Sequence, residues 1–214
     1  MIPALLDLPL AVCVVDDNSP DGTGTLADDW ARRSSRVQVL HRAGKYGLGS
    51  AYIAGFRRAL DNGADSILTM DADFSHHPRY IPEMLKAIEG ADLVIGSRYV
   101  PTGEVRYPFH RRLLSRTANM VAKVALGLHP RDCTAGFRLY RDYTLKSIPL
   151  ESVFSNGYSF LIEILTMIQR RGYRVVEVPI IFEDRKYGET KISSREIYKA
   201  LYTVGRLAVR RLLK

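Results

Sequence analysis

The sequence predicts a single α/β domain with a mainly parallel central sheet flanked by helices and an amphipathic helix at its carboxyl end. Three observations lead to this prediction. Short apolar, β-branched runs stop abruptly at turn residues, which is typical of buried parallel strands. Helical patterns alternate with these runs. Polar residues follow three of the runs, and ligands of such sheets bind outside the carboxyl ends of the strands.

The first half of the chain carries the clearest alternation. Expected strands cover 10–15, 37–41, 66–70 and 92–96, and expected helices cover 23–33, 50–61 and 81–89. The first strand is the run LAVCVV, which the turn-rich segment 16–22 ends. The helix over 50–61 carries Ile53, Phe56 and Leu60 at helical spacing, and Pro82 lies in the first turn of the helix over 81–89, where proline is tolerated.

The second half is less regular. It contains a long expected helix over 111–126, a strand over 136–140, a helix over 159–171, a strand over 175–182 and a closing helix over 195–214. We therefore expect one α/β domain over 1–194, followed by a basic amphipathic helix over 195–214 that contacts a membrane surface.

Composition excludes several classes of protein. The 214 residues are 46% hydrophobic and 25% charged, which suits a folded domain. No run of about 18 apolar residues occurs, so no transmembrane helix is expected. The two cysteines, Cys13 and Cys133, are too few for a disulfide framework and are expected to be reduced and structural. A secreted disulfide scaffold, an integral membrane protein and a coiled coil are thereby excluded.

The basic surplus is confined to two segments. The net charge is +8, yet residues 98–116 hold five Arg against one Glu, and residues 195–214 hold six basic residues against one Glu. Such clustering indicates a phosphate-bearing partner or an anionic membrane surface. The alternative is that both segments are solvated helix faces.

Paired carboxylates follow two of the expected strands. Asp71 and Asp73 lie two apart on a segment expected to be extended, so both carboxylates would point the same way and suit Mg²⁺ or Mn²⁺. A surface turn is the alternative. The adjacent His76 and His77 are interpreted as turn and helix-start residues rather than metal ligands. Asp16-Asp17 would either form a turn or contact a ribose or base edge.

Several motifs together resemble a known family. They are Asp16-Asp17-Asn18-Ser19-Pro20-Asp21-Gly22-Thr23, Met70-Asp71-Ala72-Asp73, Gly96-Ser97-Arg98-Tyr99 and Asp184-Arg185-x-Tyr187-Gly188-x-x-Lys191. In this order and spacing they resemble the polyprenol (dolichol) phosphate mannose synthases, which are inverting glycosyltransferases of family 2 with a GT-A fold. The likeness runs over nearly the whole chain.

The resemblance implies a donor site. Asp17 and the backbone of Val15 would contact the nucleoside of GDP-mannose. Asp71, Ala72 and Asp73 would hold the diphosphate, with Asp73 as the main ligand of the metal. Ser75 stands where some members carry a Gln that completes the metal site.

The resemblance also implies an acceptor site and a closing loop. Arg98, Arg111 and Ser115 match positions that cradle the acceptor phosphate. Arg185 and Lys191 match a loop that closes over the diphosphate, and Asn156 stands where other members carry a Lys.

One departure from the family concerns its opening strand, which ends near Pro-Thr-Tyr-Asn-Glu and lines the base pocket. Residues 2–7 resemble the helix that follows that strand. The strand lies in the middle of the family's sheet, so we expect two of the remaining strands to lack a partner along one edge.

The expected activity is metal-dependent, inverting transfer of mannose from GDP-mannose to a polyprenyl phosphate, with Mg²⁺ or Mn²⁺ as cofactor. The protein is expected to act at the cytoplasmic face of the membrane, attached peripherally through a membrane-anchoring partner subunit. No nucleic-acid partner is expected. Two alternatives stay open at this point. One is the same fold with another donor such as UDP-glucose, and the other is a non-catalytic basic module that binds nucleic acid or anionic lipid.

Overall fold

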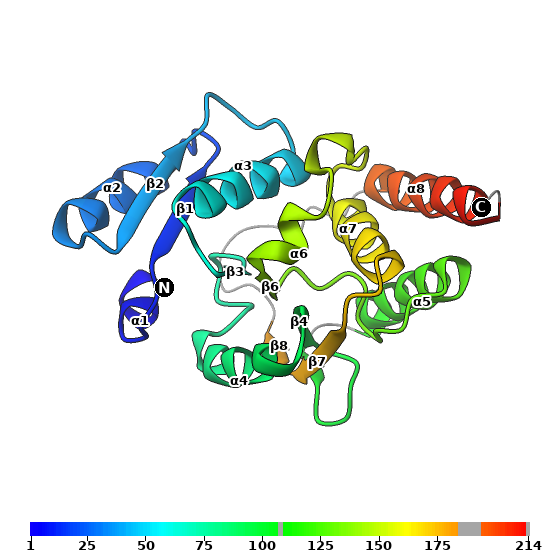
Figure 1. Cartoon of the computed structure of the whole chain (residues 1–214). Coiled ribbons are helices and arrows are strands. Elements are labelled where there is room, and N and C mark those ends of the chain that lie inside the picture. Colours follow the sequence, from blue (N-terminus) through cyan, green and yellow to red (C-terminus); the bar gives the residue numbers. More distant parts are fainter. Residues whose placement is uncertain (107–108, 184–193, 213–214) are drawn as a thin grey trace. The chain divides into compact units, whose positions relative to one another are not determined.

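The computed structural model describes residues 1–106, 109–183 and 194–212 (Figure 1). Within them the chain forms two compact units, Met1–Ala64 and Asp65–Lys214. Each unit is described by itself. The closing helix, expected as a segment apart, packs on two helices of the second unit.

The first unit is a two-stranded parallel sheet with three helices. Its elements are α1 (Ile2–Leu6), β1 (Val12–Asp16), α2 (Thr23–Arg33), β2 (Val37–His41) and α3 (Leu48–Asp61). Strand β1 pairs with β2 in the register Val12↔Val37. The start of α2 approaches the end of β1 so closely that a Cβ on Gly24 would lie 2.6 Å from Asp16 Oδ2. Only glycine leaves room for this approach.

The second unit contains a four-stranded mixed sheet and a short two-stranded one. Its elements are β3 (Ser66–Thr69), η1 (Pro78–Tyr80), α4 (Ile81–Ala87), η2 (Ile88–Gly90), β4 (Leu93–Ser97), β5 (Glu104–Arg106), α5 (Phe109–Leu126), β6 (Arg138–Arg141), α6 (Asp142–Lys146), η3 (Leu150–Ser152), α7 (Tyr158–Arg170), β7 (Val175–Pro179), β8 (Ile181–Glu183) and α8 (Ser194–Leu212). The strand orders are β3-β6-β4-β7 and β5-β8.

Strand β6 makes the larger sheet mixed. It lies between β3 and β4 and is antiparallel to both, so that Leu139 is opposite Leu68 on one side and Val94 on the other. Because β3 and β4 both oppose β6, they run in the same direction, and their carboxyl ends meet at one edge of the sheet. The pairs β1-β2 and β4-β7 are parallel, as expected, and β5, a strand that the sequence did not predict, pairs in parallel with β8.

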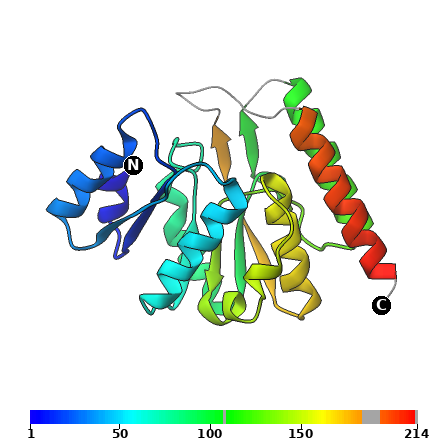
Figure 2. The ribbon, with the colours of Figure 1, turned by 90° about the horizontal axis from the view of Figure 1, so that it is seen from above.

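The core lies on both sides of β4, whose five residues are all buried. Helix α4 contributes the fully buried Ile81 and Met84, and α7 contributes Phe160 and Leu165. Figure 2 shows α5 and α8 side by side at the end of this unit, and the two helices are in contact. No helix in the described part of the chain is long and apolar enough to cross a membrane.

One expected strand is divided in the structure, whereas the expectation of strands with an unpaired edge agrees with it. The strand expected over 175–182 is divided at Ile180, whose N–H donates to Ser97 O and whose carbonyl accepts from Glu104 N, so β7 and β8 belong to different sheets. Among the described strands, β1 pairs with β2 alone and β3 with β6 alone, so each has one edge without a ladder partner.

Candidate active site

The turn after β3 brings two carboxylates to the edge of the sheet. The expectation of an extended segment through Asp71 and Asp73 is wrong, because β3 ends at Thr69 and residues 72–73 form a turn. Asp73 Oδ1 accepts hydrogen bonds from Ser75 N at 3.0 Å and from the Ser75 hydroxyl at 2.5 Å. A carboxylate that bonds the backbone two residues ahead favours a turn over a strand.

A buried histidine, His76, hydrogen-bonds the backbone of this turn. His76 Nδ1 accepts a hydrogen bond from Asp71 N at 3.0 Å, and the ring stacks on Phe137 with centroids 5.2 Å apart. Burial lowers the pKa of His76, although the Asp71 carboxylate acts in the opposite direction. The neutral ring therefore carries its proton on Nε2. His77 caps the following 3₁₀ helix by accepting from Arg79 N, so both histidines are turn and helix-start residues, as expected.

An arginine at the end of β4 lies in the same region and forms a two-point ion pair. Arg98 Nε donates to Asp132 Oδ2 and Nη2 donates to Asp132 Oδ1, both at 2.7 Å. Nη2 also donates to Thr134 Oγ1 at 2.8 Å, and Arg98 N donates to Asp132 Oδ2 at 3.1 Å. Asp132 is completely buried, and the Arg98 side chain is 11% exposed. The guanidinium is thus fixed in position and partly neutralised.

Backbone contacts fix the segment that carries Asp132. Glu177 of β7 accepts from the N–H groups of Arg131 and Asp132 at 2.8 and 2.9 Å. The buried Asn119 of α5 accepts from Cys133 N at 2.8 Å. Residues 131–133 are therefore held to both β7 and α5.

A buried arginine completes this framework. Arg138 is fully buried, and its guanidinium donates to the carbonyls of Cys133, Ala135 and Leu161, each at 2.8 Å. It ties the segment before β6 to α7. The planar fork of five donors suits such a site, which a lysine would not fill.

The candidate acceptor residues on α5 are only partly described. The Ser115 hydroxyl accepts a hydrogen bond from Tyr99 Oη at 2.7 Å. The guanidinium of Arg98 lies 5.2 Å from the centroid of the Tyr99 ring. The structure therefore brings Ser115 and Arg98 together through Tyr99. Arg111 belongs to α5, but its side chain lies outside the described part of the structure.

The candidate residues for the diphosphate and the closing loop are less informative. Asn156 is exposed, and its carbonyl accepts from the Ser159 hydroxyl at 2.7 Å near the start of α7. Arg185 and Lys191 both lie outside the described residues.

The first unit holds the candidate nucleoside-binding residues. Asp17, just after β1, accepts from Arg42 Nη1 at 2.6 Å, and Arg42 Nη2 donates to the Ser50 hydroxyl at 2.6 Å. The buried Asp16 accepts from Ser19 N at 3.3 Å, which is the turn that the sequence allowed. Val15 is half-buried in β1.

The carboxylates after β3 fit a divalent metal ion bound with a substrate. The described residues contain no group of three His, Cys, Asp or Glu that would hold an ion by themselves. Mg²⁺ and Mn²⁺, however, are commonly bound by one or two carboxylates together with substrate phosphates and water. Asp71, whose side chain is 39% exposed, and the half-buried Asp73 provide such a pair of oxygen ligands.

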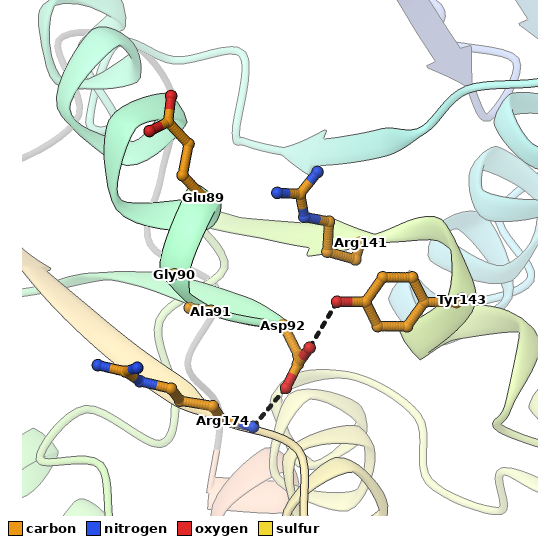
Figure 3. A pocket seen from close by; sticks show the side chains of 7 residues that line it. All are labelled: Glu89, Gly90, Ala91, Asp92, Arg141, Tyr143 and Arg174. Atoms are coloured by element: carbon orange, nitrogen blue, oxygen red, sulfur yellow. Dashed lines mark hydrogen bonds between the residues drawn. The ribbon is translucent and has the colours of Figure 1, made fainter.

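A cavity in the second unit lies away from these residues (Figure 3). It measures about 350 Å³ and lies at the opposite end of β4. The Asp92 carboxylate in its wall accepts from Tyr143 Oη and from Arg174 N, both at 2.6 Å. These bonds join the start of β4 to α6 and to the residue before β7, so the Asp92 carboxylate has a structural role in holding the sheet together.

Sequence reasoning missed three of the residues that organise the site. They are Asp132, Glu177 and Arg138, and each hydrogen-bonds the backbone of another segment. Nothing in the sequence around Asp132 distinguishes it from a surface charge. A charged residue within a strand pattern was the available signal for Glu177 and Arg138.

Residues 2–148 match the family "Glycosyl transferase family 2". The chain belongs to this family. Two relatives confirm the resemblance drawn from the motifs. The chain is 47% identical over 196 residues to an undecaprenyl-phosphate mannosyltransferase of Micrococcus luteus, covering 91% of this chain and 81% of the relative. It is 46% identical over 202 residues to a polyprenol monophosphomannose synthase of Mycolicibacterium smegmatis, covering 93% and 76%. It is a glycosyltransferase.

A solved structure confirms the GT-A fold. Glucosyl-3-phosphoglycerate synthase from Mycobacterium tuberculosis, crystallised with Mn²⁺, UDP-glucose and phosphoglyceric acid, matches with a TM-score of 0.64. The match covers 92% of this chain and 68% of that chain at 20% sequence identity. At this identity the likeness concerns the fold alone.

Proposed function

We propose that this glycosyltransferase transfers mannose from GDP-mannose to a polyprenyl phosphate, with inversion, and that the reaction depends on Mg²⁺ or Mn²⁺. The observation that carries the proposal is the 46–47% identity, over more than nine tenths of the chain, to two proteins named for polyprenyl-phosphate mannose synthesis. The arrangement of carboxylates and arginine in the second unit supports it.

Donor contacts are proposed for each unit separately. Asp17 and the backbone of Val15 would contact the nucleoside, with Arg42 holding the Asp17 carboxylate. Asp71, Ala72 and Asp73 would face the diphosphate, and Asp71 and Asp73 would hold the ion. The Ser75 hydroxyl already donates to Asp73, so its proposed role is to orient that carboxylate.

The acceptor site is proposed around Arg98, Ser115 and Arg111, and its chemistry follows from the acceptor being an anion. A polyprenyl phosphate oxygen can attack the anomeric carbon without first losing a proton, so orientation and charge neutralisation matter more than a general base. The buried His76 agrees with this, because its Nδ1 is already occupied by Asp71 N and its pKa is lowered, chiefly by burial.

In the proposed reaction the bond from the anomeric carbon to the diphosphate breaks as the bond to the acceptor oxygen forms on the opposite face. A bound divalent ion would neutralise the charge that develops on the leaving diphosphate. Arg98, fixed by Asp132 and Thr134, keeps a cation at the end of β4 without a change of side-chain conformation. Asn156, Arg185 and Lys191 are proposed to contact the diphosphate side.

We also propose peripheral attachment at the cytoplasmic face of the membrane, through α5, α8 and an anchoring partner subunit. The α5 stripe, which we define as Leu113, Thr117, Met120, Val121 and Val124, lies along one outer face of that helix and is exposed throughout. Helix α8 exposes Tyr198, Leu201, Tyr202 and Val209. Apolar helix faces bordered by basic residues are typical of segments that lie on a membrane surface.

The test is a transfer assay with labelled donor and a polyprenyl phosphate in detergent, with and without Mn²⁺. GDP-mannose should support transfer, and UDP-glucose should not. Activity with UDP-glucose alone would show that the proposed donor is wrong, and nucleic-acid binding without transfer would show that the proposed function is wrong.

Asp73→Asn should abolish Mn²⁺-dependent GDP binding in calorimetry, because the change removes the charge of the carboxylate and nearly keeps its shape. Glu83→Gln on the exposed side of α4 is the matched control. Undiminished GDP binding by Asp73→Asn in Mn²⁺ would overturn the metal assignment.

A further inference from the structure

A basic pocket lies between α5 and the segments on either side of it. It measures about 300 Å³ and is lined by Tyr99, Arg116, Asn119, Met120, Lys123 and Arg131. Three of these residues are cationic and none is acidic. The ion pairs found among the described residues include none from Arg116, Lys123 or Arg131.

The geometry of α5 places this pocket beside the α5 stripe. Arg116 and Lys123 are seven residues apart, which is about two helical turns, so they lie one above the other on the same side of the helix. Met120 lies between them, lines the pocket and is 62% exposed as a member of the stripe. The pocket therefore opens where an apolar surface meets a row of cations.

The walls of the pocket are held in place by contacts already described. Tyr99 is fixed by its bond to Ser115, and the Arg116 guanidinium lies 5.8 Å from the centroid of the Tyr99 ring. Asn119 is buried and donates to Thr134 Oγ1 at 3.1 Å, and the backbone of Arg131 is bonded to Glu177. Lys123 Nζ donates to His129 O at 3.0 Å, which uses one of its three protons.

We propose that this pocket binds the phosphate of an anionic phospholipid in the membrane, while the α5 stripe contacts the acyl region. The ligand is a lipid headgroup, separate from the polyprenyl phosphate that the enzyme consumes. A cationic pocket that opens on an apolar face fits a molecule with an anionic head and apolar tails. The inference rests on the proposed membrane-surface function and adds to it a choice among lipids.

The experiment is sedimentation of the full chain with vesicles of phosphatidylcholine alone, and with vesicles in which half of the lipid is phosphatidylglycerol. The test variant is Arg116→Gln/Lys123→Gln, in which Gln keeps hydrogen-bond donors, including one for His129 O. The matched control is Arg58→Gln/Lys86→Gln, which removes the same charge from α3 and α4. We expect the test variant to bind the mixed vesicles about twenty-five-fold more weakly, from roughly fivefold for each of its two basic residues. The control should stay within about twofold of the original chain.

The other outcomes overturn the proposal. If both variants lost equal affinity for the mixed vesicles, the effect would be one of net charge and not of the pocket. Displacement of bound chain by millimolar glycerol phosphate, as effective as added phosphatidylglycerol, would make the pocket a site for soluble phosphate. Transfer to a short-chain polyprenyl phosphate in detergent should stay within about twofold for the test variant. A parallel loss of that transfer would assign the pocket to the acceptor site. The same detergent assay on the original chain tests the proposed function independently. Circular dichroism melting confirms that each variant is folded.

Discussion

The ion pair between Arg98 and Asp132 allows a worked prediction for Asp132→Asn. The change keeps the shape of the side chain but removes its charge, and it can place an amide donor against guanidinium donors. Three of the four hydrogen bonds to Arg98 described above, all to Asp132, lose a charged acceptor. Arg98 is left 11% exposed without its counter-ion.

The magnitude follows from the burial of the pair. Removing one partner of a buried ion pair costs about 3–5 kcal/mol, and we take about 3 kcal/mol because Arg98 keeps some contact with water. For a chain of this size that corresponds to a fall in the melting temperature of roughly 6–12 °C. Asp142→Asn is the control, because its pair with Lys146 is a solvent-accessible i,i+4 contact, and such pairs contribute little to stability.

The assay is thermal unfolding by circular dichroism as a function of pH. Burial by itself raises the pKa of the Asp132 carboxyl, but the charge and hydrogen bonds of Arg98 outweigh it and hold that pKa below its usual range. The stabilisation is therefore fully present above the unfolded pKa of about 3.9 and is lost as the pH falls through the lower folded value. An Asp132→Asn chain that melts within about 2 °C of the original at pH 7 would refute the reasoning.

Three further predictions concern the cysteines, a histidine and the loop that is not described. Burial raises the pKa of the Cys133 thiol to about 12, so iodoacetamide at pH 8 should label the exposed Cys13 and spare Cys133. Peptide mass spectrometry of the labelled native chain measures this. Equal labelling of the two cysteines would contradict the burial of Cys133. The pKa of His76 is lowered by burial, so its contribution to stability should be fully present above the unfolded pKa of about 6.5 and should decrease as the pH falls below that value. An NMR titration that places the pKa of His76 above 6.5 would contradict its buried position. Lys191→Ala should lower turnover more than affinity for the proposed donor GDP-mannose, because the loop closure implied by the family resemblance would act only once the site is filled. A selective loss of affinity in calorimetry would argue against that closure.

Much of the fold could be predicted from local pattern. The strand over 37–41 matches β2, and the helix over 23–33 matches α2, because each is a short periodic segment bounded by turn residues. The antiparallel insertion of β6 could not be predicted, because pairing between Leu139 and Leu68 depends on contacts far apart in the chain. The division at Ile180 has the same origin, since only its partners in other strands distinguish it from a continuous run.

The site divides in a similar way. The positions of Asp71, Asp73 and Arg98 at strand ends could be read from residue type and spacing. Their environment could not, because whether an Asp holds an ion or an arginine depends on what the fold brings to it. Asp132 shows this plainly, since it follows Pro130 and Arg131 in an irregular segment and yet is completely buried.

The position of β6 has a consequence for how the chain is made. Strands β3 and β4 reach the ribosome exit in sequence order, but the strand that joins them ends only at Arg141. At a synthesis rate of about 5–20 residues per second, the backbone N–H and C=O groups along the β6-facing edge of β4 stay unpaired for a few seconds. A nascent chain halted before Arg138 should therefore be a target for chaperones. One halted well beyond Pro179, where β7 ends, should resist proteases over this sheet.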